Sequence, residues 1–178
     1  PVEQLPNWIA DVRQILSAHE KTCFPLNGIY FRFGKASPSY LGMSAGRDTA
    51  YLGIEYTLRQ AGEAVPKNYF VNLEIEQMSI RKYGARPHWG KNSVAIFEDM
   101  PAKFPKWDDF MAFKTEMDPH NVFTNEFWKR ASGEVPLSDY MTPECNARGE
   151  CYCETDDHCA TGTTCQPGKW YHEANICM

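Results

Sequence analysis

The sequence lacks the features that mark several large functional classes. It contains no apolar run long enough to span a bilayer, so no membrane-spanning segment is expected. Its lysines and arginines form no cluster or stripe and the formal net charge is −5, which argues against nucleic acid as a partner. No G-x-G-x-x-G or similar phosphate-cradling loop occurs, so the chain alone is not expected to hold a dinucleotide. N-glycosylation is not expected either, because no sequon is present.

The composition indicates a folded globular protein. Hydrophobic residues make up 43% of the 178 residues and aromatic residues 13%, which is too apolar for a disordered chain. This length is enough for one core, or for one core with a small appendage.

Hydrophobic periodicity predicts a mixture of helices and strands. Residues 7–20 form an amphipathic pattern, with Trp8, Val12 and Ile15 on one face. Residues 69–83 fit both a strand and a helix, and we favour the helix, with Gly84 as its C′ residue. The other predicted elements are strands at 28–35, 49–58 and 93–97 and a helix at 105–117. Together they predict an α+β fold, a mostly antiparallel sheet covered by helices.

The cysteines are concentrated at the C-terminal end. Six of the seven fall within 33 residues after a linker-like stretch at 132–136, an even count that is typical of a disulfide framework in an oxidising compartment. A zinc site with His158 or His172 is the rival interpretation, but the spacing lacks the usual C-x2–4-C pairs. The six are Cys145, Cys151, Cys153, Cys159, Cys165 and Cys177, and about 15 pairings are possible among them.

The seventh cysteine, Cys23, lies far from the others in the sequence. If the six pair among themselves, Cys23 is left to form an intermolecular bridge or to remain a buried thiol. We leave both alternatives open.

The most informative motif is the run Pro87-His88-Trp89-Gly90-Lys91-Asn92. Gly90 suits a place where the backbone approaches another group closely, His88 carries an imidazole and Lys91 is a compact positive charge. An ordinary solvated loop is the alternative interpretation of these letters.

This motif resembles the flavin-facing loop of sugar-lactone and alditol oxidases of the vanillyl-alcohol-oxidase type. The resemblance extends over nearly the whole chain. Residues 27–37 are similar to a substrate-side strand of that family, residues 75–84 lead into the loop, and Asp118–Phe123 looks like the family's DPxxxF motif. The cysteine tail is similar to that of secreted plant L-gulonolactone-oxidase-like proteins.

The resemblance implies a substrate, or cap, domain over residues 1–138 and a disulfide module over residues 139–178. It implies an FAD-dependent oxidation of a small sugar lactone or polyol, with FAD held by an N-terminal domain that is a separate chain or has been removed. The isolated chain is then expected to be inactive. The implied location is secreted, extracellular or vacuolar.

The resemblance also assigns roles to individual residues. Lys91 would stabilise negative charge on the flavin, and His88 would bind the cofactor, orient the loop or contact the substrate side. Arg32 would reach the substrate. Where the family reads Glu-x-Arg this chain has Tyr30, so the family's aldonolactone specificity does not follow, and Glu55 is a possible substitute for a histidine on the next strand. From its residue type, Trp89 is expected to serve in packing.

A non-enzymatic role is the alternative function. A processed piece stabilised by its disulfides would act as a secreted binding or defence protein. Tyr152, Trp170 and Tyr171 in the tail would then form a contact or sugar-stacking surface; the alternative is that they form the core of the small module.

Overall fold

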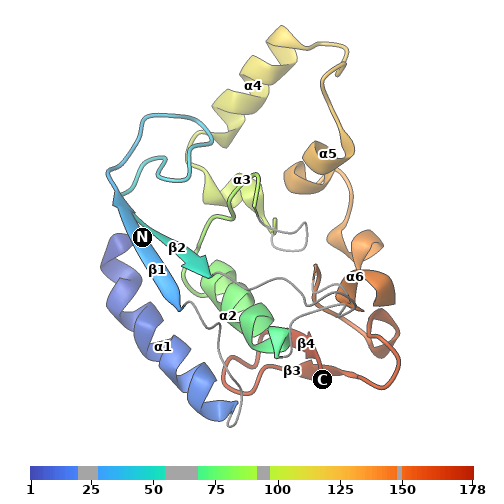
Figure 1. The fold of residues 1–178 in the computed structure, drawn as a ribbon. Helices are drawn as coiled ribbons and strands as arrows, with labels where there is room; N and C mark the ends of the chain where they lie inside the picture. The colour runs from blue at the N-terminus through green and yellow to red at the C-terminus, as the bar shows by residue number, and fades with distance from the viewer. Residues whose placement is uncertain (20–27, 55–67, 92–96, 148–149) are drawn as a thin grey trace.

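The computed structural model describes residues 1–19, 28–54, 68–91, 97–147 and 150–178. The fold is α+β, as predicted, with several helices and two small antiparallel sheets of two strands each, β1–β2 and β3–β4 (Figure 1). No helix within these ranges has the length and apolar character needed to cross a membrane. The elements in chain order are η1 (Val2–Gln4), α1 (Leu5–Ala18), β1 (Ile29–Gly34), β2 (Thr49–Ile54), α2 (Tyr69–Arg81), α3 (Met100–Lys103), α4 (Trp107–Met117), α5 (Glu126–Ser132), η3 (Leu137–Tyr140), α6 (Pro143–Ala147), η4 (Asp156–His158), β3 (Cys165–Pro167) and β4 (Asn175–Cys177).

The helix predictions are confirmed, with shifts at their ends. Helix α1 begins two residues before the predicted start at residue 7, because Pro6 sits in the first turn, where it loses no helical hydrogen bond. The ambiguous stretch at 69–83 is helical and forms α2. Gly84 has the left-handed φ of 57°, but Lys82 is the C-cap, so the C′ residue is Tyr83 and Gly84 lies one residue beyond it.

Strands β1 and β2 form an antiparallel hairpin in which Ile29 pairs with Ile54 and Gly34 with Thr49. The predicted strand at 28–35 is confirmed. Of the predicted strand at 49–58, the described part ends at Ile54, and most of the predicted strand at 93–97 lies outside the described residues.

Helices α1 and α2 cover one face of the hairpin and enclose the first core. Three α1 residues, Trp8, Val12 and Ile15, pack with Ile75 and Met78 of α2. These side chains recur every three or four residues, so each helix presents a continuous apolar stripe. Strand residues Ile29, Phe31, Leu52 and Ile54 pack against the same cluster.

A second core lies beside the far end of α2. It joins Ile80 to side chains from α3, α4 and α5 and includes many aromatic rings, among them the nearly parallel pair Trp107 and Trp128, whose ring centroids are 5.8 Å apart. Pro105 lies outside α4, which therefore starts at Trp107 rather than at the predicted residue 105. Asp108 and Asp109 occupy its first turn, where their negative charges interact favourably with the positive end of the helix dipole.

The six C-terminal cysteines form three disulfides, as expected for an oxidised framework. The pairs are Cys145–Cys151, Cys153–Cys165 and Cys159–Cys177, with Cα–Cα distances of 5.7, 5.8 and 5.6 Å. Cys23 lies outside the described residues.

The cysteine segment docks on α2 through a buried carboxylate. Glu74 has no exposed surface, and its two oxygens accept hydrogen bonds from the backbone N–H groups of Lys169, Trp170 and Tyr171 at 3.2, 2.9 and 2.8 Å. His19 Nε2 lies 2.6 Å from the same carboxylate. Successive N–H groups that converge in this way form an anion-binding nest, which compensates the desolvation of the carboxylate.

One turn further along α2, Gln77 continues the contact. Its side-chain oxygen accepts from Asn175 N at 3.0 Å, and its amide nitrogen donates to Asn175 O at 2.9 Å. The side-chain amide of Gln77 therefore satisfies both the N–H and the carbonyl group of this β4 residue. It makes the two hydrogen bonds that a neighbouring strand would make at this position.

Gly168→Ala should destabilise the protein by about 1–3 kcal/mol, because overpacking displaces backbone or buried groups. A Cβ at Gly168 would lie 2.8 and 2.9 Å from the Cδ and Cγ atoms of Glu74 and would also meet the carbonyl oxygen of Tyr171. Gly90→Ala is the matched control, since the nearest atom to its Cβ is His88 Cε1 at 3.9 Å. Urea unfolding measures both variants, and equal free energies of unfolding would contradict the docking geometry.

Candidate functional site

Arg32 lies on the face of the hairpin that points away from the core. Its neighbour Phe31 packs with Trp8, and Arg32 itself is exposed, with its guanidinium carbon 5.6 Å from the centroid of the Tyr30 ring. Tyr51 is its cross-strand partner. The outer face of the hairpin therefore presents one cation between two phenol rings.

Glycines make room for these rings. A Cβ at Gly53 would overlap the ring of Tyr30, and a Cβ at Gly34 would lie 2.7 Å from the ring of Tyr51. Each tyrosine ring therefore lies over a glycine of the other strand. This packing fixes the two rings beside Arg32.

The loop that follows α2, residues 84–91, is held on the protein by two side chains that point inward. Trp89 donates from Nε1 to Leu41 O at 2.9 Å and packs with Phe97 and Phe104, whose ring centroids are 5.5 and 5.7 Å from its own. The prediction that Trp89 serves packing is confirmed.

Arg86 is the second anchor of this loop. Its Nε donates to Lys103 O at 2.7 Å, and its Nη1 donates to Met43 O at 3.1 Å and to Ala45 O at 2.8 Å. Burial and, secondarily, the charge of Arg47 lower the pKa of Arg86 to about 10. A guanidinium that binds three carbonyls fixes the backbone on either side of it.

His88 and Lys91 occupy the outward positions of the same loop. Both side chains are exposed. Pro87, which separates His88 from the anchor Arg86 in the sequence, is buried. The ring nitrogen Nδ1 of His88 accepts from Gly90 N at 3.1 Å, and its carbonyl accepts from Lys91 N at 3.2 Å. The loop is thus a tight turn that presents an imidazole and an ammonium group from a fixed backbone.

A partly buried ion pair joins the two ends of the segment that contains this loop. Arg81, the last residue of α2, donates from Nε and Nη2 to the two oxygens of Glu98 at 3.1 and 2.8 Å. The two side chains are 25% and 21% exposed, so the pair is only weakly accessible to solvent. Such a bidentate arrangement fixes orientation as well as distance.

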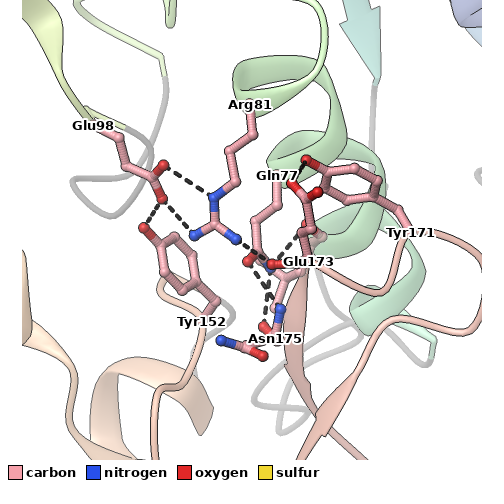
Figure 2. Close-up of polar contacts among 8 residues, drawn as sticks. Gln77, Arg81, Glu98, Tyr152, Tyr171, Glu173 and Asn175 are labelled. Carbon is pink, nitrogen blue, oxygen red and sulfur yellow. Dashed lines mark hydrogen bonds and ion pairs between the residues drawn. The ribbon is translucent and has the colours of Figure 1, made fainter.

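The cysteine segment completes this ion pair (Figure 2). The hydroxyl of Tyr152 donates to Glu98 Oε1, and the tyrosine ring lies 5.1 Å from the Arg81 guanidinium. The remaining arm of Arg81 donates to the backbone carbonyl of Glu173. We call Arg81, Glu98 and Tyr152 the latch.

The pKa shifts within the latch agree with this geometry. Burial alone would raise the pKa of Glu98, but hydrogen bonds from Arg81 and Tyr152 and the Arg81 charge hold it below its usual range. Burial and the Glu98 charge raise the pKa of the Tyr152 hydroxyl. The latch at neutral pH is therefore a charged pair with a neutral phenol as donor.

The structure brings two of the predicted site residues, His88 and Lys91, together on one loop, whereas Arg32 lies on the hairpin and Glu55 lies outside the described residues. Sequence reasoning missed the anchor Arg86 and the latch. A usable signal was present, because polar residues interrupt the apolar pattern of α2 at 74, 77 and 81, a spacing that places them on one helix face.

Of the tail aromatics, Tyr152 is buried and Tyr171 is partly buried, whereas Trp170 is 46% exposed. The core interpretation therefore holds for Tyr152, and Trp170 is the ring that solvent reaches.

Comparison with known proteins identifies relatives of the whole chain. L-gulonolactone oxidase 2 of Arabidopsis thaliana is 31% identical over 184 residues, an alignment that covers 99% of this chain and 30% of the relative. Probable truncated L-gulonolactone oxidase 7, mitochondrial, of the same plant is 30% identical, and 72% of its length is covered. L-gulono-1,4-lactone dehydrogenase of Mycobacterium tuberculosis is 34% identical over 59% of this chain.

The chain spans about 30% of the length of L-gulonolactone oxidase 2 and of most of the other plant relatives that it matches. No solved structure matches it significantly. The family model for the C-terminal domain of L-gulonolactone oxidase 2-like proteins matches residues 142–178. The model for D-arabinono-1,4-lactone oxidase matches residues 1–131, and with this match over most of its length the chain belongs to the D-arabinono-1,4-lactone oxidase family of sugar-lactone oxidoreductases.

Proposed function

We propose that this chain is the substrate-side part of an FAD-dependent oxidoreductase that oxidises a hydroxyl of a sugar lactone or a related polyol. The observation that carries the proposal is the loop at 84–91, which is fixed by Trp89 and Arg86 and presents His88 and Lys91 outward. A preorganised positive charge is what a site needs where negative charge develops during a reaction.

His88 and Lys91 suit one edge of a flavin ring, but they do not account for binding of the rest of FAD. When bound, a flavin accepts hydride equivalents, and Lys91 would supply a positive charge beside the ring while His88 would contact the ring or the substrate. The sequence has no glycine-rich loop to cradle the phosphates of FAD. We infer that a separate FAD-binding part holds the cofactor.

Exposed apolar side chains support a covering partner of this kind. Phe113 and Met117 on α4 are 51% and 66% exposed, and Val122 and Phe123 in the next turn are 74% and 84% exposed. The Asp118 carboxylate accepts from the backbone N–H groups of Val122 and Phe123, which fixes the turn. Apolar side chains held rigidly in water are typical of an interface.

The substrate face would include Arg32. Its planar guanidinium suits oxygen-rich ligands, and the flanking phenols of Tyr30 and Tyr51 provide hydroxyl donors and acceptors. Because Tyr30 stands where the family has a glutamate, we do not adopt an aldonolactone specificity, and the proposed substrate is a sugar lactone or a polyol.

The chain divides, in this proposal, into a substrate domain over residues 1–138 and a disulfide module over residues 139–178. The two family models support the division, since they match residues 1–131 and 142–178. Three disulfides support an oxidising location, either secreted or vacuolar.

Lys91→Met in the protein joined to its FAD-binding part should slow flavin reduction by about 10²-fold or more, the effect of losing one preorganised electrostatic group. Stopped-flow absorbance of the flavin measures the rate. Lys169→Met is the matched control, because this exposed lysine uses its backbone rather than its side chain to bind Glu74. Equal rates in the two variants would reject a role for the loop in flavin chemistry.

The isolated chain should neither bind FAD stoichiometrically nor turn over L-gulono-1,4-lactone with added FAD, because it lacks a phosphate-binding loop. Equilibrium dialysis with FAD measures binding, and oxygen consumption measures turnover. Addition of the FAD-binding part should restore a yellow complex. Turnover by the 178-residue chain alone would refute the proposed division of labour.

A further inference from the structure

The segment that carries the candidate loop begins and ends at the latch. Residue 82 follows Arg81 directly, and residue 97 precedes Glu98, so the Arg81–Glu98 ion pair closes the base of the segment at 82–97. Joining the two ends of a segment restricts the positions available to a loop within it, here the loop at 84–91. His88 and Lys91 lie inside this segment.

The cysteine segment supplies the third member of the latch from a constrained position. Tyr152 stands between Cys151 and Cys153, which pair with Cys145 and Cys165 respectively. Two disulfides thus fix the backbone on both sides of the phenol. The exposure of Tyr152 is 4%, so its hydroxyl meets Glu98 in a site that excludes most water.

A further contact ties the same segment to the helix that precedes the loop. The carbonyl of Glu173 accepts from Arg81, and Gln77 binds Asn175 from the same helix face (Figure 2). Glu74 holds residues 169–171 on this helix as well. The disulfide module therefore contacts α2 over about two turns, up to the residue where the loop segment begins.

We propose that the cysteine-rich segment is a clamp that positions the loop at 84–91, with Tyr152 as the positioning residue that completes the Arg81–Glu98 latch. The disulfides keep Tyr152 in place, so oxidation of the module sets the rigidity of the loop that presents Lys91. The consequence for flavin chemistry rests on the proposed function, whereas the mechanical coupling between module and loop does not.

Tyr152→Phe tests the clamp, because it removes the hydroxyl donated to Glu98 but keeps the ring beside Arg81. Tyr171→Phe is the matched control, since that hydroxyl bonds Glu173 Oε2 at 2.7 Å, outside the latch. The readout is amide hydrogen exchange of this chain over residues 82–91, where the N–H groups of Ala85 and Lys91 are hydrogen-bonded. Loss of a hydrogen bond to a charged group should speed exchange there about 10-fold.

Exchange over α1 should be unchanged in both variants, which shows that the fold is intact. Glu98→Gln is the second variant and should raise the exchange rate over 82–91 by the same factor. Reducing the disulfides of the wild-type protein with a phosphine should raise this rate by at least as much. Equal exchange over 82–91 in Tyr152→Phe and Tyr171→Phe, or no response to reduction, would overturn the clamp. This measurement involves no flavin, so a negative result would reject the clamp without affecting the proposed role of Lys91. Equally, a negative result for Lys91 in flavin reduction would not affect the clamp.

Discussion

The buried carboxylate of Glu74 is the interaction on which the arrangement of the chain depends. It sits on α2 with no exposed surface and is stabilised by three backbone N–H groups of the tail and by His19. A charge in such a place is tolerated only while these partners remain, since their loss leaves it desolvated and unpaired. The tail is therefore part of the environment that keeps α2 folded, although it is far away in the sequence.

Helix α2 serves two purposes because its faces differ. One stripe, which includes Val71, Ile75 and Met78, packs on α1 and the hairpin, and another stripe of polar residues receives the cysteine segment. The apolar stripe contributes most of the burial energy, while the polar stripe contributes direction through hydrogen bonds. A helix held on both faces is a firm base for the loop that follows its last turn.

The candidate loop shows how packing turns an ordinary surface segment into a preorganised one. Inward residues Arg86 and Trp89 bind carbonyls and aromatic rings of other elements, and outward residues His88 and Lys91 remain exposed. Fixing the backbone in this way removes the entropy that a flexible loop would lose on binding a ligand. This is the physical basis for assigning chemistry to the loop.

The sequence by itself indicated the three longest helices α1, α2 and α4, the two strands of the hairpin and the disulfide framework. Local periodicity indicates which residues share a face, and an even group of clustered cysteines indicates pairing, although not which cysteine pairs with which. The HWGK motif also pointed to His88 and Lys91. It did not reveal that Arg86, a residue of unremarkable local context, anchors the loop.

Only the tertiary structure decided how the distant segments meet. Glu74 contacts residues 169–171, and Tyr152 reaches Glu98, across separations of 95 and 54 residues at the least. Local patterns carry no information about such separations, because the partner of a buried polar group is selected by the packing of whole elements around it. The sequence thus specified which groups needed partners, and the fold determined which groups they found.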